Sequence, residues 1–230
     1  MEKVIRYGLS GLLLVSLLLI TSAYQLSYQP TQEALEAYKN ATPTSFGYEY
    51  NTSSSNHIIF YPGGLVSPLA YAPLAYELSL EGFRVSVVEV FLNLAITMPN
   101  ALSNVDTSSS QRIVLMGHSL GGVAASIAMR TTEVDGLILL GSYPLDSHQI
   151  IGNPAYLSLL GSQDGLLNQE AYDEAIKGLN IKEVNIQGGN HAQFGSYGPQ
   201  RDDLEATMTE KMQRQRIIEA IIEWQLQLNP

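Results

Sequence analysis

The stretch RIVLMGHSLGGVAA, residues 112–125, decides the fold of this chain. A short apolar run leads into a Gly-x-Ser-x-Gly motif, and small and apolar residues at helical spacing follow it. This order of strand, sharp turn and helix predicts a nucleophile elbow, which raises the Ser119 hydroxyl above the sheet edge. Gly117 and Gly121 are expected there because a Cβ at either position would collide as strand and helix close on each other. A plain Gly-rich turn between strand and helix is the alternative interpretation.

Composition restricts the classes of protein to which the chain can belong. Its 230 residues suffice for one domain, or for one domain with an appendage, and 45% hydrophobic content allows an ordinary core. The formal net charge is −10 and the Lys and Arg residues do not cluster, so nucleic acid is not an expected partner. The absence of Cys excludes disulfides, thiolate metal sites and a Cys nucleophile.

Residues 1–23 predict a targeting segment. Lys3 and Arg6 give it a positive start, an apolar run follows, and small residues at 21–23 suit a cleavage site. A cleaved signal peptide and an uncleaved membrane anchor are both open, with a buried N-terminal helix as the third possibility. Because Lys3 and Arg6 would keep the N-terminus inside, we expect an extracytoplasmic protein that is membrane-anchored through this segment or secreted.

The next segment, residues 24–45, is polar and contains Pro30 and Pro43, which predicts a tether with at most a short helical patch. Residues 46–230 are the predicted catalytic domain. Besides the elbow strand, strands are predicted at residues 46–50, 57–61, 84–90, 136–141, 156–161 and 181–186. Besides the elbow helix, helices are predicted at 68–82, 95–110, 169–178 and 207–224, the last opened by a capping box. Short apolar strands alternating with helices predict an α/β fold, with a mainly parallel sheet covered on both faces.

An activated Ser needs a base within hydrogen-bond reach and an acid that orients the base; in an elbow fold they follow in the order Ser, acid, His. Among the four His residues, His191 fits best, because its loop directly follows the last predicted strand. His57 precedes Ser119 and enters a strand, His118 should pack beneath Ser119, and His148 comes early in the order. The alternative for His191 is a solvated loop histidine.

Two aspartates compete for the role of the acid. Asp164 and Asp146 each follow a predicted strand, at the sheet edge where open α/β folds bind ligands. Asp164 is favoured because it stands in an Asp-Gly turn just ahead of the strand that leads to His191. An Asx turn or a helix cap is its structural alternative.

The oxyanion of an acyl-transfer reaction needs two backbone N–H donors. Leu120, the residue after the Ser, supplies one. The loop after strand 57–61 supplies the other, where Gly63 and Gly64 let the backbone approach closely, although a turn before the next helix explains them too. No cluster with metal-ligand spacing and no phosphate-binding loop occurs, so neither a metal nor a cofactor is expected.

Together these motifs resemble the small alpha/beta-hydrolase family related to dienelactone hydrolases. The matching motifs are FYPGGL (60–65), GHSLGG (117–122), GSQDG (161–165) and GGNHAQFG (188–195), and the resemblance extends over about residues 46–227. It implies an alpha/beta-hydrolase fold, a Ser119–Asp164–His191 triad and hydrolysis of a carboxylic ester or similar acyl bond in a small molecule. It also marks residues 197–200 as the loop continuing past the His. Dienelactone hydrolases proper use a Cys nucleophile, so their specific substrate is not carried over to a chain with Ser119.

The connection of residues 142–155 contains Pro144, Gly152 and Pro154, which leave no room for a lid of two or more helices. The expected protein is a serine hydrolase that works through an acyl-enzyme. Two alternatives stay open: a non-catalytic surface domain of the same fold that binds a ligand, and a thioesterase, peptidase or acyltransferase on the same elbow. The sequence does not indicate an oligomeric state.

Overall fold

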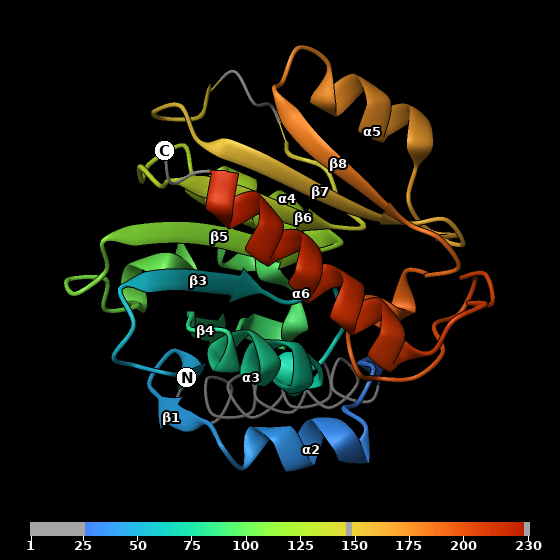
Figure 1. The fold of residues 1–230 in the computed structure, drawn as a ribbon, viewed down its shortest axis with the longest axis horizontal. Helices are drawn as coiled ribbons and strands as arrows, with labels where there is room; N and C mark the ends of the chain where they lie inside the picture. The colour runs from blue at the N-terminus through green and yellow to red at the C-terminus, as the bar shows by residue number, and fades with distance from the viewer. Residues whose placement is uncertain (1–25, 146–148, 228–230) are drawn as a thin grey trace, which may run out of the picture.

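A single sheet of eight strands runs through the computed structural model, which describes residues 26–145 and 149–227 (Figure 1). The strand order is β1-β2-β4-β3-β5-β6-β7-β8. Strands β3 to β8 pair in parallel, whereas β2 pairs antiparallel with both β1 and β4. The predicted α/β architecture with a mainly parallel sheet is therefore confirmed.

Every predicted strand is present. The strands are β1 (Thr42–Thr44), β2 (Gly47–Tyr50), β3 (Asn56–Tyr61), β4 (Arg84–Val88), β5 (Arg112–His118), β6 (Gly136–Leu140), β7 (Ala155–Gly161) and β8 (Ile181–Ile186). β4 and β6 are buried at every residue, because both faces of a parallel sheet are covered. β8 is only partly buried, as its place at the edge of the sheet requires.

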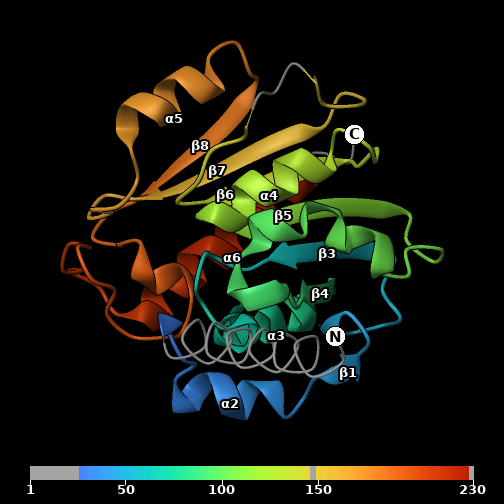
Figure 2. The ribbon, with the colours of Figure 1, turned by 180° about the vertical axis from the view of Figure 1, so that it is seen from behind.

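Helices cover both faces of the sheet. The helices are α2 (Gln32–Tyr38), α3 (Ala72–Leu80), α4 (Leu120–Ala128), α5 (Gln169–Ile176) and α6 (Glu210–Gln227). α3 and α6 lie on the face seen in Figure 1, and α4 lies on the opposite face, seen in Figure 2. Each face has its own hydrophobic cluster, one with Leu78 and Trp224 and the other with Ala124 and Ala128. Between β6 and β7, the described residues 141–145 and 149–154 contain no α-helix.

Residues 26–45 belong to the folded domain, so the prediction of a polar tether that ends at residue 45 is wrong for them. α2 packs beside α3 through the fully buried Ala34, and the Tyr50 hydroxyl donates a hydrogen bond to the Ala37 carbonyl at 2.9 Å. β1 adds an antiparallel edge strand to β2. The few apolar residues of this polar segment therefore suffice to attach it to the domain, because α3 and β2 provide a surface on which they pack.

Two predicted helices differ from the structure. Residues 95–110 form 3₁₀ turns, Ala95–Thr97 and Pro99–Asn104, because Tyr61 takes the place of helical partners: its hydroxyl donates to the Pro99 carbonyl and accepts from the Leu102 N–H. α6 begins at Glu210, three residues after the predicted start at residue 207. Its capping side chain is Thr209, which accepts from the Met212 N–H, rather than Thr207.

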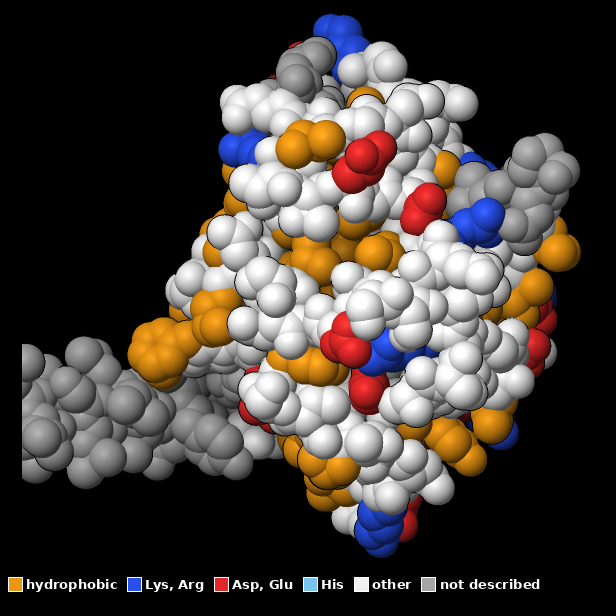
Figure 3. Space-filling model, turned by 90° about the vertical axis from the view of Figure 1, so that its left-hand side faces the viewer, with side chains coloured by type: hydrophobic (Ala, Val, Ile, Leu, Met, Phe, Trp, Pro, Cys, Tyr) orange, Lys and Arg blue, Asp and Glu red, His pale blue; other side chains and the backbone are white. Residues whose placement is uncertain are grey.

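The parallel strands all point toward the right in Figure 1, and the loops after β5, β6, β7 and β8 meet at that edge. Figure 3 shows the opposite edge, where the strands begin and where acidic and basic side chains lie among polar and apolar ones. The predicted targeting segment, residues 1–23, lies outside the described residues. Within residues 26–145 and 149–227, no helix is both long and apolar enough to cross a bilayer.

Candidate active site

The predicted elbow joins β5 to α4, and Ser119 stands at its tip. Its backbone has φ 52° and ψ −124°, a conformation that costs a non-glycine residue about 1–3 kcal/mol. A Cβ on Gly117 would lie 2.4 Å from the Gly121 carbonyl carbon, and a Cβ on Gly121 would lie 2.2 Å from the Tyr61 oxygen. Only glycine fits at either position. The contact at Gly117 is between strand and helix, as predicted, whereas Gly121 is required by the end of β3 rather than by the elbow strand.

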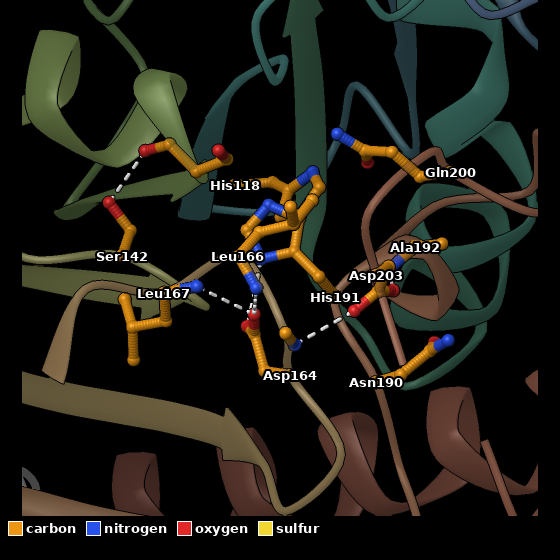
Figure 4. Close-up of polar contacts among 12 residues, drawn as sticks. His118, Ser142, Asp164, Leu166, Leu167, Asn190, His191, Ala192, Gln200 and Asp203 are labelled. Carbon is orange, nitrogen blue, oxygen red and sulfur yellow. Dashed lines mark hydrogen bonds and ion pairs between the residues drawn. The ribbon is translucent and has the colours of Figure 1, made fainter. Parts of the chain in front are cut away.

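Hydrogen bonds from β6 hold this strained turn. The Ser119 N–H donates to the Leu140 carbonyl at 3.0 Å. The Ser142 hydroxyl, which is labelled in Figure 4, donates to the Ser119 carbonyl at 2.6 Å. Both backbone groups of Ser119 are therefore fixed, one by the last residue of β6 and the other by Ser142 just after it. The side chain is left as the free part of the residue, and Ser119 is half-buried.

Asp164 and His191 come together at the same edge of the sheet. Asp164 Oδ2 lies 2.8 Å from His191 Nδ1, and both side chains are only 3% exposed. The other oxygen, Oδ1, accepts from the Leu166 and Leu167 N–H groups at 2.9 and 2.8 Å (Figure 4). The carboxylate is thus fully engaged, and it fixes the histidine with Nδ1 toward the acid and Nε2 on the far side of the ring.

Gly141 brings this pair next to the elbow. It follows Leu140, the residue that accepts from the Ser119 N–H, and its φ is +51°. A Cβ built on Gly141 would lie 2.8 Å from Asp164 Oδ2 and 3.0 Å from His191 Nδ1. The structure therefore places all three predicted residues, Ser119, Asp164 and His191, around the end of β6.

Asp203 is a site residue that the sequence did not reveal. Its Oδ2 accepts from the Ala192 N–H at 2.8 Å, and its Oδ1 accepts from the Gly165 N–H at 3.0 Å. One carboxylate thus joins the residue after His191 to the residue after Asp164 (Figure 4). Asp203 stands in a polar loop, residues 200–205, without any motif spacing, so nothing in the sequence distinguishes it from its neighbour Asp202.

A second fastening of the histidine loop comes from α6. Gln213, which is fully buried, accepts from the Asn190 N–H at 3.0 Å and donates to the Asn190 carbonyl at 2.9 Å. Because the N–H and the carbonyl of Asn190 both bond to Gln213, the loop that carries His191 is fixed relative to α6. This glutamine was likewise not predicted.

The other histidines have different surroundings. His57 is buried in β3 between the hydroxyls of Ser86 and Ser110, at 2.8 and 2.9 Å, as expected of a structural residue. His118 is buried under the elbow, with its ring centroid 4.6 Å from that of His191. Burial and the nearby His191 hold the pKa of His118 well below its usual value, so it stays neutral. Asp146 and His148 lie outside the described residues.

The two glycines expected in the oxyanion site are not equivalent. The Gly63 N–H already donates to the Tyr71 hydroxyl at 2.9 Å, so Gly63 is not free to serve as the donor. Gly64 lies against the elbow, since a Cβ on it would be 3.5 Å from Leu120 Cβ. Within residues 26–145 and 149–227, the N–H groups of Gly64 and Leu120 have no hydrogen-bond partner.

Residues 57–215 match the model of the alpha/beta hydrolase family, and the chain belongs to this family. A search of curated proteins gives no match.

Similar solved structures include TT1662 from Thermus thermophilus, with a TM-score of 0.58, 11% identity, and coverage of 83% of this chain and 98% of that one. Carboxylesterase CesB (YbfK) from Bacillus subtilis has a TM-score of 0.54, 12% identity and coverage of 89% and 97%. A Klebsiella pneumoniae protein assigned as a dienelactone hydrolase has a TM-score of 0.55, 14% identity and coverage of 75% and 90%. At such identities these similarities show the shared fold alone.

Proposed function

We propose that this protein is a serine hydrolase that cleaves a carboxylic ester, or a similar acyl bond, through an acyl-enzyme on Ser119. The observation that carries the proposal is the 2.8 Å hydrogen bond between Asp164 and His191 beside the strained Ser119. A buried Asp–His pair next to a raised Ser is the arrangement that activates a hydroxyl as a nucleophile. A domain that only binds a ligand has no use for it.

In the proposed reaction, the Ser119 hydroxyl attacks the carbonyl carbon of the substrate and His191 Nε2 takes its proton. The tetrahedral intermediate then collapses, the bond to the leaving alcohol breaks, and His191 returns the proton to that alcohol. Water next attacks the acyl-enzyme, with His191 again as base, and releases the acid and free Ser119. Asp164 holds the tautomer of His191 and stabilises the imidazolium that forms in both half-reactions.

The Leu120 and Gly64 N–H groups are the proposed oxyanion donors. Both lie beside the elbow, on adjacent segments, and neither has another partner within residues 26–145 and 149–227. Donors that are fixed before the reaction stabilise the developing negative charge without reorganising. The N-terminal end of α4, which begins at Leu120, adds a favourable dipole.

The proposal also includes the cellular location of the protein and the length of acyl chain that the site accepts. Residues 1–23, as a signal peptide or anchor, would place the domain outside the cytoplasm; N-terminal sequencing of the purified protein distinguishes the two. The described residues 141–145 and 149–154 form no helical lid, so we expect short acyl chains to be turned over faster than long ones.

Hydrolysis of aryl acetates and butyrates by wild type and Ser119→Ala tests the proposal. We expect the variant to retain the fold and less than about a hundredth of the activity, because loss of an activated nucleophile costs far more than that. Higher residual activity would remove Ser119 as the nucleophile. Faster turnover of acyl thioesters than of esters, or transfer of the acyl group to an added alcohol, would favour a thioesterase or acyltransferase on the same elbow.

A further inference from the structure

We infer that Tyr71 is a positioning residue, whose single hydroxyl holds the oxyanion loop against the nucleophile elbow. The inference rests on the proposed function, since it concerns the same acyl-transfer reaction. Tyr71 is the last residue of the 3₁₀ turn Pro68–Tyr71, directly before α3, and is 1% exposed. It is neither on the elbow nor on the oxyanion loop, yet it touches both.

Two hydrogen bonds meet at the Tyr71 hydroxyl oxygen. The Gly63 N–H donates to it at 2.9 Å, and His118 Nδ1 lies 2.8 Å away. Gly63 directly precedes the proposed donor Gly64, and His118 directly precedes Ser119. The hydroxyl therefore ties together the residues next to the two reacting parts of the site.

The proton on this bridge can be assigned. An N–H group only donates, so the oxygen accepts from Gly63, and the hydroxyl proton of Tyr71 is left for His118 Nδ1. Burial raises the pKa of Tyr71, and burial together with His191 lowers the pKa of His118, so the hydroxyl keeps its proton and the imidazole stays neutral. The reverse arrangement, with Nδ1 donating, would leave both the buried hydroxyl proton and His118 Nε2 without a partner, whereas the assigned arrangement leaves only the Nε2–H group without a hydrogen bond among the described residues.

This bridge has two consequences for catalysis. Because the Gly63 N–H donates to Tyr71, the loop is held in the position that brings Gly64 against Leu120. His118 also accepts a hydrogen bond that favours its neutral form. When His191 takes the Ser119 proton, its neighbour 4.6 Å away therefore carries no charge that would oppose the imidazolium.

The ring of Tyr71 is fixed as firmly as its hydroxyl. It packs on Phe60 with ring centroids 4.5 Å apart. A Cβ on Gly195, in the loop after His191, would lie 3.0 Å from Tyr71 Cε1, so this loop also rests on the ring. One side chain thus contacts the oxyanion loop, the elbow and the histidine loop.

Tyr71→Phe tests the inference, and Tyr61→Phe is the matched control. Tyr61 is equally buried at the end of β3, and its hydroxyl also bridges a backbone N–H, that of Leu102, and an acceptor, the Pro99 carbonyl. Both variants lose the same kind of buried bridge, so they should lose similar stability. Only Tyr71→Phe should lower kcat for an aryl acetate, by about 10–100-fold with KM within about twofold, because oxyanion contacts form in the transition state. Its affinity for an aryl boronic acid, which forms an anionic adduct on Ser, should fall in proportion.

A second pair of variants keeps the test decisive if Tyr71→Phe does not fold. The side-chain oxygen of Asn at position 118 can take the place of Nδ1 as acceptor, whereas Leu offers none. We expect His118→Asn to retain most of kcat and His118→Leu to lose it. Equal kcat in Tyr71→Phe and Tyr61→Phe, or in the two His118 variants, would overturn the inference while leaving the proposed function intact. A wild type without esterase activity would overturn both.

Discussion

The carboxylate of Asp164 meets the imidazole of His191 at 2.8 Å, although the two residues are 27 positions apart in the chain. The parallel pairing of β7 and β8 explains this contact, since the loops that follow both strands leave the sheet at the same edge. Both loops are then fastened by other residues, so the pair is formed before any substrate arrives. A preformed pair is what the proposed proton transfer from Ser119 requires.

Asp164→Asn should lower kcat for a simple ester by about 10³–10⁴-fold, because an amide at this position favours the wrong tautomer of His191. Asp146→Asn is the matched variant, since Asp146 follows the preceding strand and was the competing candidate. The Asp146→Asn substitution should lower kcat by less than about threefold. Steady-state kinetics of both variants decide the point, and the opposite ranking would move the acid to the end of β6.

Gly141→Ala should abolish most of the activity, because the added Cβ would lie 2.8 Å from Asp164 Oδ2 and 3.0 Å from His191 Nδ1. Gly178→Ala is the control: its φ of +81° imposes a comparable backbone penalty, but nothing lies within 4 Å of the new Cβ. We expect each substitution to cost about 1 kcal/mol or more in stability and only Gly141→Ala to lower kcat by more than about 100-fold. Equal activity of the two variants would show that Gly141 is not packed against a catalytic pair.

Asp203→Asn should lower kcat by about 10-fold or more, because the amide replaces a carboxylate that accepts from both Ala192 and Gly165. Asp202→Asn is the control, since in the part of the chain that the structure describes the Asp202 carboxylate pairs only with the exposed Arg201, and its φ of 69° suits Asn equally well. Measurement of kcat for both variants, at a temperature where thermal unfolding shows both to be folded, checks the prediction. Should both variants behave as wild type, Asp203 does not position the pair.

The pH dependence of stability should contain a contribution from His57. Burial, aided by the charge of Arg84, lowers its pKa to about 4 from the ordinary value of 6.5. Between these values the unfolded chain binds a proton that the folded chain does not. The free energy of unfolding should therefore fall as the pH falls, by up to about 1.4 kcal/mol per pH unit. Urea unfolding should show a shallower fall for His57→Asn than for wild type between about pH 6.5 and about pH 4; parallel curves would contradict this.

Much of the fold could be predicted because its determinants are local. Gly117 is required by its contact with Gly121, four positions along the chain, and each buried strand is a short apolar run. His191 could be found because the order of elements places its loop at the edge that Ser119 shares. For these residues, sequence position alone predicts spatial position.

The remaining features depend on long-range contacts that no local pattern records. Tyr61 replaces the helical partners of residues 99–102, so a stretch expected to be helical forms 3₁₀ turns. Tyr71 occupies the Gly63 N–H from another segment, which distinguishes Gly63 from Gly64. Asp203 acts through backbone N–H groups, and such a role imposes no residue type on its partners.

Covalent labelling of the purified protein with a fluorophosphonate, followed by peptide mass spectrometry, tests the central claim most directly. We predict that one phosphonyl group attaches to the Ser119 hydroxyl of wild type, that labelling disappears in Ser119→Ala, and that it is slowed by orders of magnitude in His191→Ala. Ser142→Ala is the control, because Ser142 contacts the elbow through the Ser119 carbonyl and should leave the site of labelling unchanged. A wild type that is folded yet unlabelled, or a Ser119→Ala variant labelled as fast as wild type, would contradict Ser119 as the activated nucleophile.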